Sequence, residues 1–96
     1  MKNKIIKKLK EHLPEIKSRF KVKEIGVFGS RIKGKAKKRS DIDILVEFEK
    51  GNKTFDNYME LKFYLENLFG CKVDLVLKSA LKEEFKQYIL SEVIYV

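Results

Sequence analysis

The chain has 96 residues and a mass of 11.3 kDa, which fits one domain over residues 1–96 and excludes separate cofactor and substrate domains. Hydrophobic residues make up 44 % and charged residues 38 %, which predicts a folded core under an ionised surface. The net charge of +8 is uneven: residues 1–40 carry +12 and residues 41–96 carry −4. This asymmetry indicates either an anionic ligand near the first half, such as a nucleotide or nucleic acid, or a lysine-rich solvated surface.

The cysteine count and the hydropathy pattern bear on the compartment. Cys71 is the only cysteine, so no intramolecular disulfide can form, and a reducing cytoplasm is the expected location. No run approaches the roughly 20 apolar residues of a membrane span. The N-terminal segment also lacks the apolar core of a signal peptide. We therefore expect a soluble cytoplasmic protein with no membrane contact.

The first half of the chain predicts a helix followed by two strands. Residues 3–19 have apolar positions at helical spacing, and Pro14 predicts a break or kink within that helix. Residues 23–28 form a short apolar run typical of a strand. Residues 31–40 are polar and basic, with room for one helical turn. Residues 42–49 alternate between apolar and polar, which predicts a strand with one buried face.

The second half predicts another helix, strand and helix. A helix is expected over residues 55–69, with Thr54 as its N-cap and Gly70 as its stop. A third strand follows at residues 72–77, and Ser79 is expected to cap the last helix.

The order of these elements predicts an α/β (α+β) fold with a small mixed sheet, in the order α-β-(α)-β-α-β-α. Residues 42–49 should run antiparallel to residues 23–28 and parallel to residues 72–77, because a helix separates the second pair. The apolar tail at residues 93–96 is expected to form either a short strand or a contact between copies of the chain.

Three acidic residues should converge at one end of this sheet. Asp41 and Asp43 are two residues apart on a strand and therefore share a face, and Asp74 lies near the start of the third strand. Carboxylate oxygens are the ligands that Mg²⁺ and Mn²⁺ prefer, and two such ions occur together in phosphoryl-type transfer. We therefore expect these residues to be metal ligands and catalytic, with Asp74 as the proton acceptor.

A phosphate-binding segment precedes these carboxylates. Gly29 ends a strand and lets a phosphate approach the backbone, while Ser30 adds a hydroxyl and the backbone N–H groups of an expected helix start. Arg31 and Lys33 can then neutralise a triphosphate. Alternatively, these basic residues are exposed charges on a loop and do not bind phosphate. His12 and Glu47 are not expected in the site, since His12 lies among charged residues and Glu47 lies too far along its strand.

Residues 29–48, GSRIKGKAKKRSDIDILVEF, resemble the signature of the minimal nucleotidyltransferases of the DNA polymerase β-like superfamily. The resemblance extends over essentially the whole chain and implies that ATP is the substrate. It also implies that such a protein is the antitoxin of a pair, transferring AMP to a tyrosine of a HEPN-domain ribonuclease toxin. The positions that match the family's nucleotide- and metal-binding residues are Gly29, Ser30, Asp41, Asp43 and Asp74, with Arg31 also matching and Lys33 standing where Arg is frequent.

Two other functions are compatible with the same residues. The chain could act without catalysis, binding a nucleotide, RNA or a toxin and neutralising its partner by direct contact. It could also transfer a nucleotide to a small molecule, although so short a chain has little room for an acceptor pocket unless a dimer builds one. Stoichiometric action would favour the first alternative, and substoichiometric action with ATP would favour an enzyme.

Overall fold

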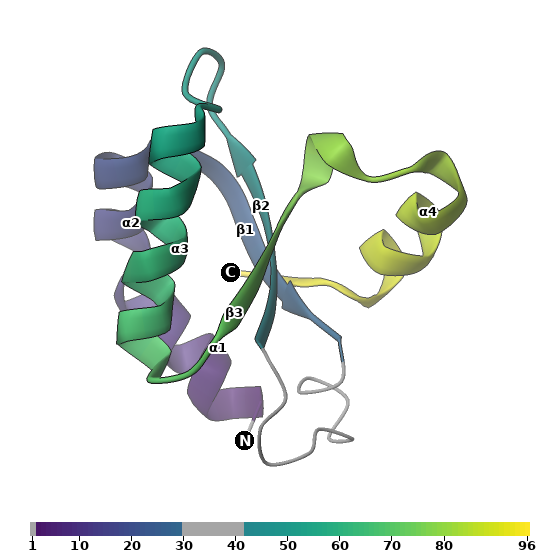
Figure 1. Ribbon diagram of the computed structural model, residues 1–96. Coiled ribbons are helices and arrows are strands. Elements are labelled where there is room, and N and C mark those ends of the chain that lie inside the picture. The colour runs from purple at the N-terminus through teal and green to yellow at the C-terminus, as the bar shows by residue number, and fades with distance from the viewer. Residues whose placement is uncertain (1, 30–41) are drawn as a thin grey trace.

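The structure is a computed structural model that describes residues 2–29 and 42–96. A central sheet separates three helices on one side from a fourth helix on the other (Figure 1). The elements in chain order are α1 (Lys2–Glu11), α2 (Leu13–Phe20), β1 (Val22–Phe28), β2 (Ile42–Phe48), α3 (Phe55–Phe69), β3 (Val73–Leu77), the 3₁₀ turn η1 (Lys78–Ala80), α4 (Glu83–Glu92) and β4 (Ile94–Tyr95). Among the described residues, none of these helices has the length and apolar character needed to cross a membrane.

The sheet has the mixed topology that the sequence predicts. Its strand order is β3-β2-β1-β4, with β1 antiparallel to both β2 and β4 and with β2 parallel to β3. Helix α3 forms the crossover between the two parallel strands, as a parallel pair requires. The strands begin or end within one residue of the expected bounds.

The core lies between the sheet and α1, α2 and α3. Alternate residues of β2 point toward these helices, because successive side chains of a strand project to opposite faces. The buried side chains of this core are Ile5, Leu9, Ile16, Phe20, Val22, Ile25, Val27, Ile42, Ile44, Val46, Phe48, Leu61, Leu65, Val73 and Leu75. The opposite face of the sheet is therefore the one available for polar groups.

The N-terminal helix is broken, as Pro14 predicts. Helix α1 ends at Glu11 and α2 begins at Leu13, so the chain changes direction at His12. Pro14 lies in the first turn of α2, where its missing N–H leaves no hydrogen bond unmade. His12 donates one hydrogen bond from its Nδ1–H to the carbonyl oxygen of Lys8, at 2.9 Å.

Helix α3 has the predicted bounds and caps. The hydroxyl of Thr54 accepts a hydrogen bond from the backbone N–H of Asn57 at 3.2 Å. Gly70 has a φ of 68° and donates its N–H to the carbonyl of Glu66, which ends the helix. These caps fix where α3 stops and therefore where β3 can start.

The predicted cap at Ser79 is wrong. Ser79 lies within η1, and α4 begins four residues later, at Glu83, after Lys82. The 3₁₀ turn and two extended residues, Leu81 and Lys82, intervene, and the hydroxyl of Ser79 instead accepts a hydrogen bond from the Lys53 ammonium at 3.1 Å. The last helix is thus separated from β3 by a short connection.

The apolar tail forms a strand, which was one of its two predicted roles. Residues Ile94 and Tyr95 pair with β1, and the N–H of Val96 donates to the carbonyl of Ile25 at 3.1 Å. The helical turn expected within residues 31–40 lies outside the described residues.

Candidate active site

The predicted site residues fall into two groups. Three of them are described by the structure and lie at one end of the sheet, where β1 ends and where β2 and β3 begin. These three are Gly29, Asp43 and Asp74. The other four, Ser30, Arg31, Lys33 and Asp41, lie outside the described residues, so their expected roles stay predictions.

Asp43 and Asp74 lie side by side on parallel strands. They are register partners in the β2–β3 pair, and neighbouring strands are about 4.8 Å apart. Their flanking residues point into the helix-covered core, so both aspartates project from the opposite face of the sheet. Asp43 is half-buried and Asp74 is exposed. The crossover topology therefore brings together two carboxylates that are distant in sequence.

Gly29 lies directly against Asp43. The antiparallel β1–β2 pair places Phe28 opposite Asp43, and Gly29 is the next residue, with a φ of 90°. A Cβ atom at position 29 would overlap the Asp43 carboxylate oxygen Oδ2 and would lie 2.8 Å from its Cγ. Both the backbone conformation and the contact therefore require glycine at this position.

Two side chains of α3 hold β3 on either side of Asp74. The hydroxyl of Tyr58 donates to the carbonyl of Leu75 at 2.6 Å, and the N–H of Val73 donates to Glu66 Oε2 at 3.1 Å. Burial raises the pKa of Tyr58, and the negative charge of Asp74 raises it further, so the hydroxyl stays protonated and can donate. The sequence pattern marks neither Tyr58 nor Glu66 as a site residue.

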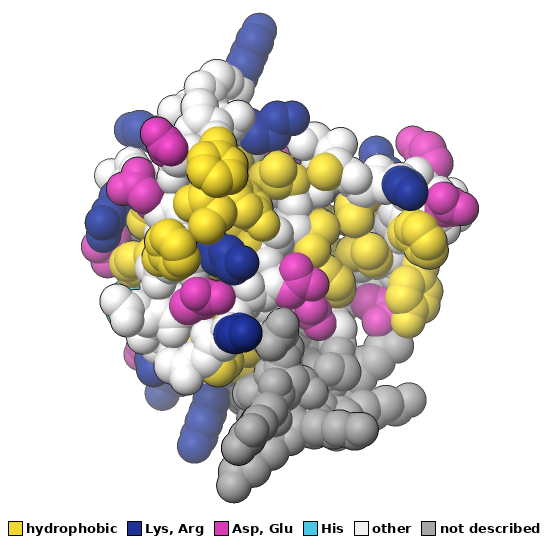
Figure 2. All heavy atoms as spheres, in the orientation of Figure 1, with side chains coloured by type: hydrophobic (Ala, Val, Ile, Leu, Met, Phe, Trp, Pro, Cys, Tyr) yellow, Lys and Arg dark blue, Asp and Glu magenta, His cyan; other side chains and the backbone are white. Residues whose placement is uncertain are grey.

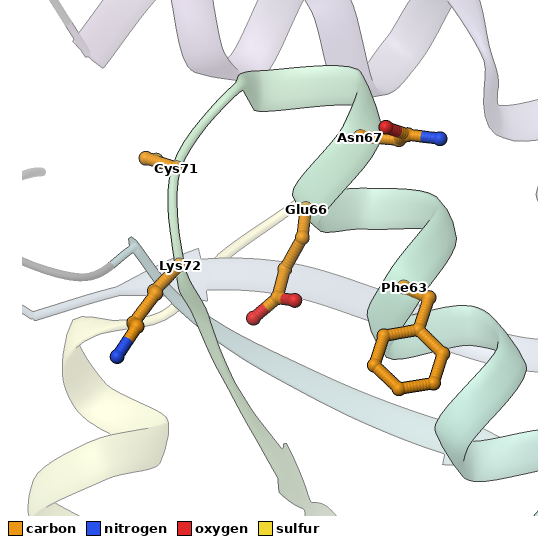
Figure 3. Close-up of a pocket in the computed structure, with 5 residues that line it drawn as sticks. All are labelled: Phe63, Glu66, Asn67, Cys71 and Lys72. Carbon is orange, nitrogen blue, oxygen red and sulfur yellow. The ribbon is translucent and has the colours of Figure 1, made fainter.

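Glu66 also lines an open hollow of about 450 Å³ between α3 and the start of β3. Its carboxylate points from the helix toward the strand, as Figure 3 shows. Cys71 lies at the same hollow and is partly buried. Asp43 and Asp74 do not line this hollow, which belongs to the junction of α3 with β3.

An ion-paired cluster lies at the other end of the carboxylate-bearing face. Lys78 Nζ is 3.0 Å from Glu24 Oε2 and 3.9 Å from Glu47 Oε1, and it lies 5.7 Å from the ring centre of Tyr95. We call these four residues the Lys78 cluster. The hydrogen bond that Lys78 donates to Glu24 raises the pKa of the Lys78 ammonium, which therefore stays charged. Glu47 is thus ion-paired with Lys78 at this end of the face.

The carboxylate end of the sheet fits a hard divalent cation. Asp43 and Asp74 supply oxygen ligands, and two carboxylates this close repel each other unless a cation neutralises them. Within residues 2–29 and 42–96, no group of three or more metal-ligating side chains occurs. A third carboxylate would have to come from Asp41, which lies outside these residues.

Comparison with known proteins places the chain in a family. The model of the nucleotidyltransferase domain matches residues 9–96, so the chain belongs to the nucleotidyltransferase domain family and is an enzyme of that class. It is similar to the protein adenylyltransferase MntA of Thermococcus cleftensis, with 50 % identity over 88 residues. That alignment covers 92 % of this chain and 88 % of the relative.

Solved structures show the same fold. A structure assigned as a minimal nucleotidyltransferase matches with a TM-score of 0.82 and 33 % identity, covering 98 % of this chain and 95 % of that one. A toxin–antitoxin structure with AMP-PNP matches with a TM-score of 0.67 and 29 % identity, covering 98 % and 70 %. A complex of a tri-AMPylated Shewanella oneidensis HEPN toxin with its MNT antitoxin matches with a TM-score of 0.57 and 26 % identity, covering 98 % and 66 %.

Proposed function

We propose that this protein is an antitoxin that transfers AMP from ATP to a tyrosine of a HEPN-domain toxin, in a reaction that depends on Mg²⁺. The observation that carries the proposal is the pairing of Asp43 with Asp74 beside Gly29 in a member of the nucleotidyltransferase family. The resemblance to a protein adenylyltransferase and to a complex that contains an AMPylated HEPN toxin supports the choice of acceptor.

Asp41, Asp43 and Asp74 would hold two Mg²⁺ ions, or Mn²⁺ in their place. Such ions offset the negative charge of the triphosphate and of the transition state. Gly29 and Ser30 would bind the phosphates through the backbone and a hydroxyl, while Arg31 and Lys33 would neutralise them. The fixed contact between Gly29 and Asp43 would keep the phosphate-binding turn in register with the carboxylates.

Asp74 is the proposed proton acceptor. It is more exposed than Asp43, so an incoming tyrosine hydroxyl can reach it, and Tyr58 and Glu66 hold its strand in place. The hydroxyl gives its proton to Asp74 as its oxygen bonds to the α-phosphorus of ATP. The bond from that phosphorus to the bridging oxygen breaks, and pyrophosphate leaves.

The test is transfer of label from ATP to the purified HEPN-domain partner. We expect label on the partner from α-labelled ATP and none from γ-labelled ATP, because pyrophosphate is lost. Asp43→Asn and Asp74→Asn should each abolish transfer. Glu47→Gln is the matched control, since Glu47 lies on the same strand and face as Asp43 but belongs to the Lys78 cluster. It should transfer label at nearly the normal rate.

Two results would contradict the proposal. Undiminished transfer by either aspartate variant would reject the role of that carboxylate. Silencing of the partner without ATP, and only at equal stoichiometry, would indicate neutralisation by direct binding. Peptide mapping of the labelled partner locates the acceptor residue. Label on a residue other than tyrosine would reject tyrosine as the acceptor.

A further inference from the structure

The segment from Lys78 to Tyr95 forms an excursion whose two ends meet at the sheet. It leaves the end of β3, contains α4, and returns as β4 along the edge of β1. The Lys78 cluster joins the ends, because Lys78 and Tyr95 lie at opposite ends of the segment and contact each other. Gly26 lets the returning strand approach, since a Cβ there would lie 2.8 Å from the carbonyl oxygen of Ile94. The base of the excursion is therefore fixed.

The helix within the excursion is, by contrast, barely embedded. Helix α4 contributes no buried residue. Phe85 and Tyr88 are three positions apart, so they lie on neighbouring turns of one helix face, and they are 54 % and 62 % exposed. Hydrophobic side chains are visible at the surface around α4 in Figure 2. Neighbouring exposed aromatic residues are typical of protein-binding surfaces.

The position of α4 suggests which protein it binds. It lies on the opposite side of the sheet from α1, α2 and α3 (Figure 1), which is the side to which Asp43 and Asp74 project. A protein acceptor must approach that side to bring a hydroxyl to the carboxylates. The first turn of α4 carries two exposed acids, Glu83 and Glu84, next to Phe85.

We propose that α4 is the docking element for the acceptor protein. Phe85 and Tyr88 enter an apolar groove on the acceptor, and Glu83 and Glu84 face basic residues at the rim of that groove. This inference rests on the proposed function for the identity of the acceptor, the HEPN-domain partner. Docking through α4 would raise the local concentration of the acceptor hydroxyl at Asp74 without altering ATP binding.

The test compares aromatic residues on the two sides of the sheet. Phe85→Ser and Phe85→Ser/Tyr88→Ser are measured against Phe63→Ser, which removes a 58 % exposed aromatic from α3. Calorimetry with the purified partner, in chelator and without ATP, should show affinity about tenfold or more weaker for the α4 variants and unchanged for the control. The KM for the partner should rise, while kcat at saturating partner and the affinity for ATP stay the same.

A charge-reversal variant tests the same surface with its aromatic residues intact. Glu83→Lys/Glu84→Lys leaves the aromatic residues in place and should weaken binding most at low salt, because the rim charges are reversed. Circular dichroism and the unfolding midpoint should match the unmodified protein in the aromatic variants, since α4 has no buried residue. Glu83→Lys/Glu84→Lys should lower the midpoint slightly, because it places positive charge at the N-terminus of α4.

The outcomes separate this inference from the proposed function. Equal partner affinity in all variants would overturn the role of α4, even if AMP transfer is observed. A dimer of this chain that Phe85→Ser dissociates would assign the surface to a second copy and would also overturn it. Weakened binding by the α4 variants, with no transfer by the unmodified protein, would support the docking surface and reject the proposed function.

Discussion

The carboxylate of Asp43 occupies the space that a side chain at position 29 would need. A Cβ on Gly29 would overlap Asp43 Oδ2, and the φ of 90° disfavours any other residue as well. Gly29→Ala should therefore act twice, by straining the backbone and by displacing the carboxylate. We expect a loss of about 1–3 kcal/mol in the free energy of unfolding from the strain. Transfer should fall about a hundredfold because Asp43 moves.

Gly51→Ala is the matched control for this prediction. Gly51 has a similar φ of 85°, but nothing lies within 4 Å of a Cβ built there. It should lose comparable stability and keep normal transfer, as measured by denaturant unfolding and by labelled ATP. Equal losses of transfer in the two variants would mean that strain, and not contact with Asp43, explains the effect.

The pairing of Asp43 with Asp74 predicts a response to metal ions. In chelator, Asp74→Asn should stabilise the protein by about 0.2–1 kcal/mol, because it removes like charges from neighbouring strands. Mn²⁺ should raise the unfolding midpoint of the unmodified protein and have little effect on that of Asp74→Asn. Thermal unfolding with and without Mn²⁺ measures both effects. A midpoint insensitive to Mn²⁺ in the unmodified protein would reject metal binding by this pair.

The hydrogen bond from Tyr58 to Leu75 predicts a stability loss. Tyr58→Phe removes the 2.6 Å contact and leaves a partly buried carbonyl on β3 without that donor. The free energy of unfolding should fall by about 1–3 kcal/mol, as measured in urea. Tyr58→Leu should cost more, since the ring also packs against the core. An unchanged midpoint for Tyr58→Phe would show that water replaces the donor.

The surroundings of Tyr64 predict that the free energy of unfolding falls at alkaline pH. Burial, together with a 2.8 Å hydrogen bond to Glu15 and the charge of that carboxylate, raises the pKa of Tyr64 from 10.0 to about 12. The folded state thus favours the protonated phenol, so its stabilising contribution is complete below pH 10 and is lost as pH rises toward about 12. In a pH titration, the absorbance of tyrosinate should rise in a step near pH 12 that Tyr64→Phe removes. Glu15→Gln should move that step to lower pH.

The sequence predicted the elements that local signals define. Helix α3 has its expected bounds because Thr54 and Gly70 act within a few residues of themselves. The juxtaposition of Asp43 and Asp74 followed from their positions at the starts of two strands, which meet in a parallel pair that a crossover helix allows. The roles of Ser30, Arg31, Lys33 and Asp41 stay predictions.

Tertiary contacts were not predictable in the same way. Ser79 had the residue type of a cap, but η1 intervenes and the hydroxyl meets Lys53 instead. Glu66 and Tyr58 support β3 through bonds to residues 7 and 17 positions away, and no local pattern marks them. The Lys78 cluster joins four parts of the chain, so its members are recognised only once the strands are in place.

Strand β4 consists of two residues, yet it protects the outer edge of β1. Proteolytic removal of residues 94–96 would leave backbone N–H and C=O groups on β1 open to a strand from another molecule. Cleavage of this short tail would therefore expose an edge strand through which copies of the chain could associate.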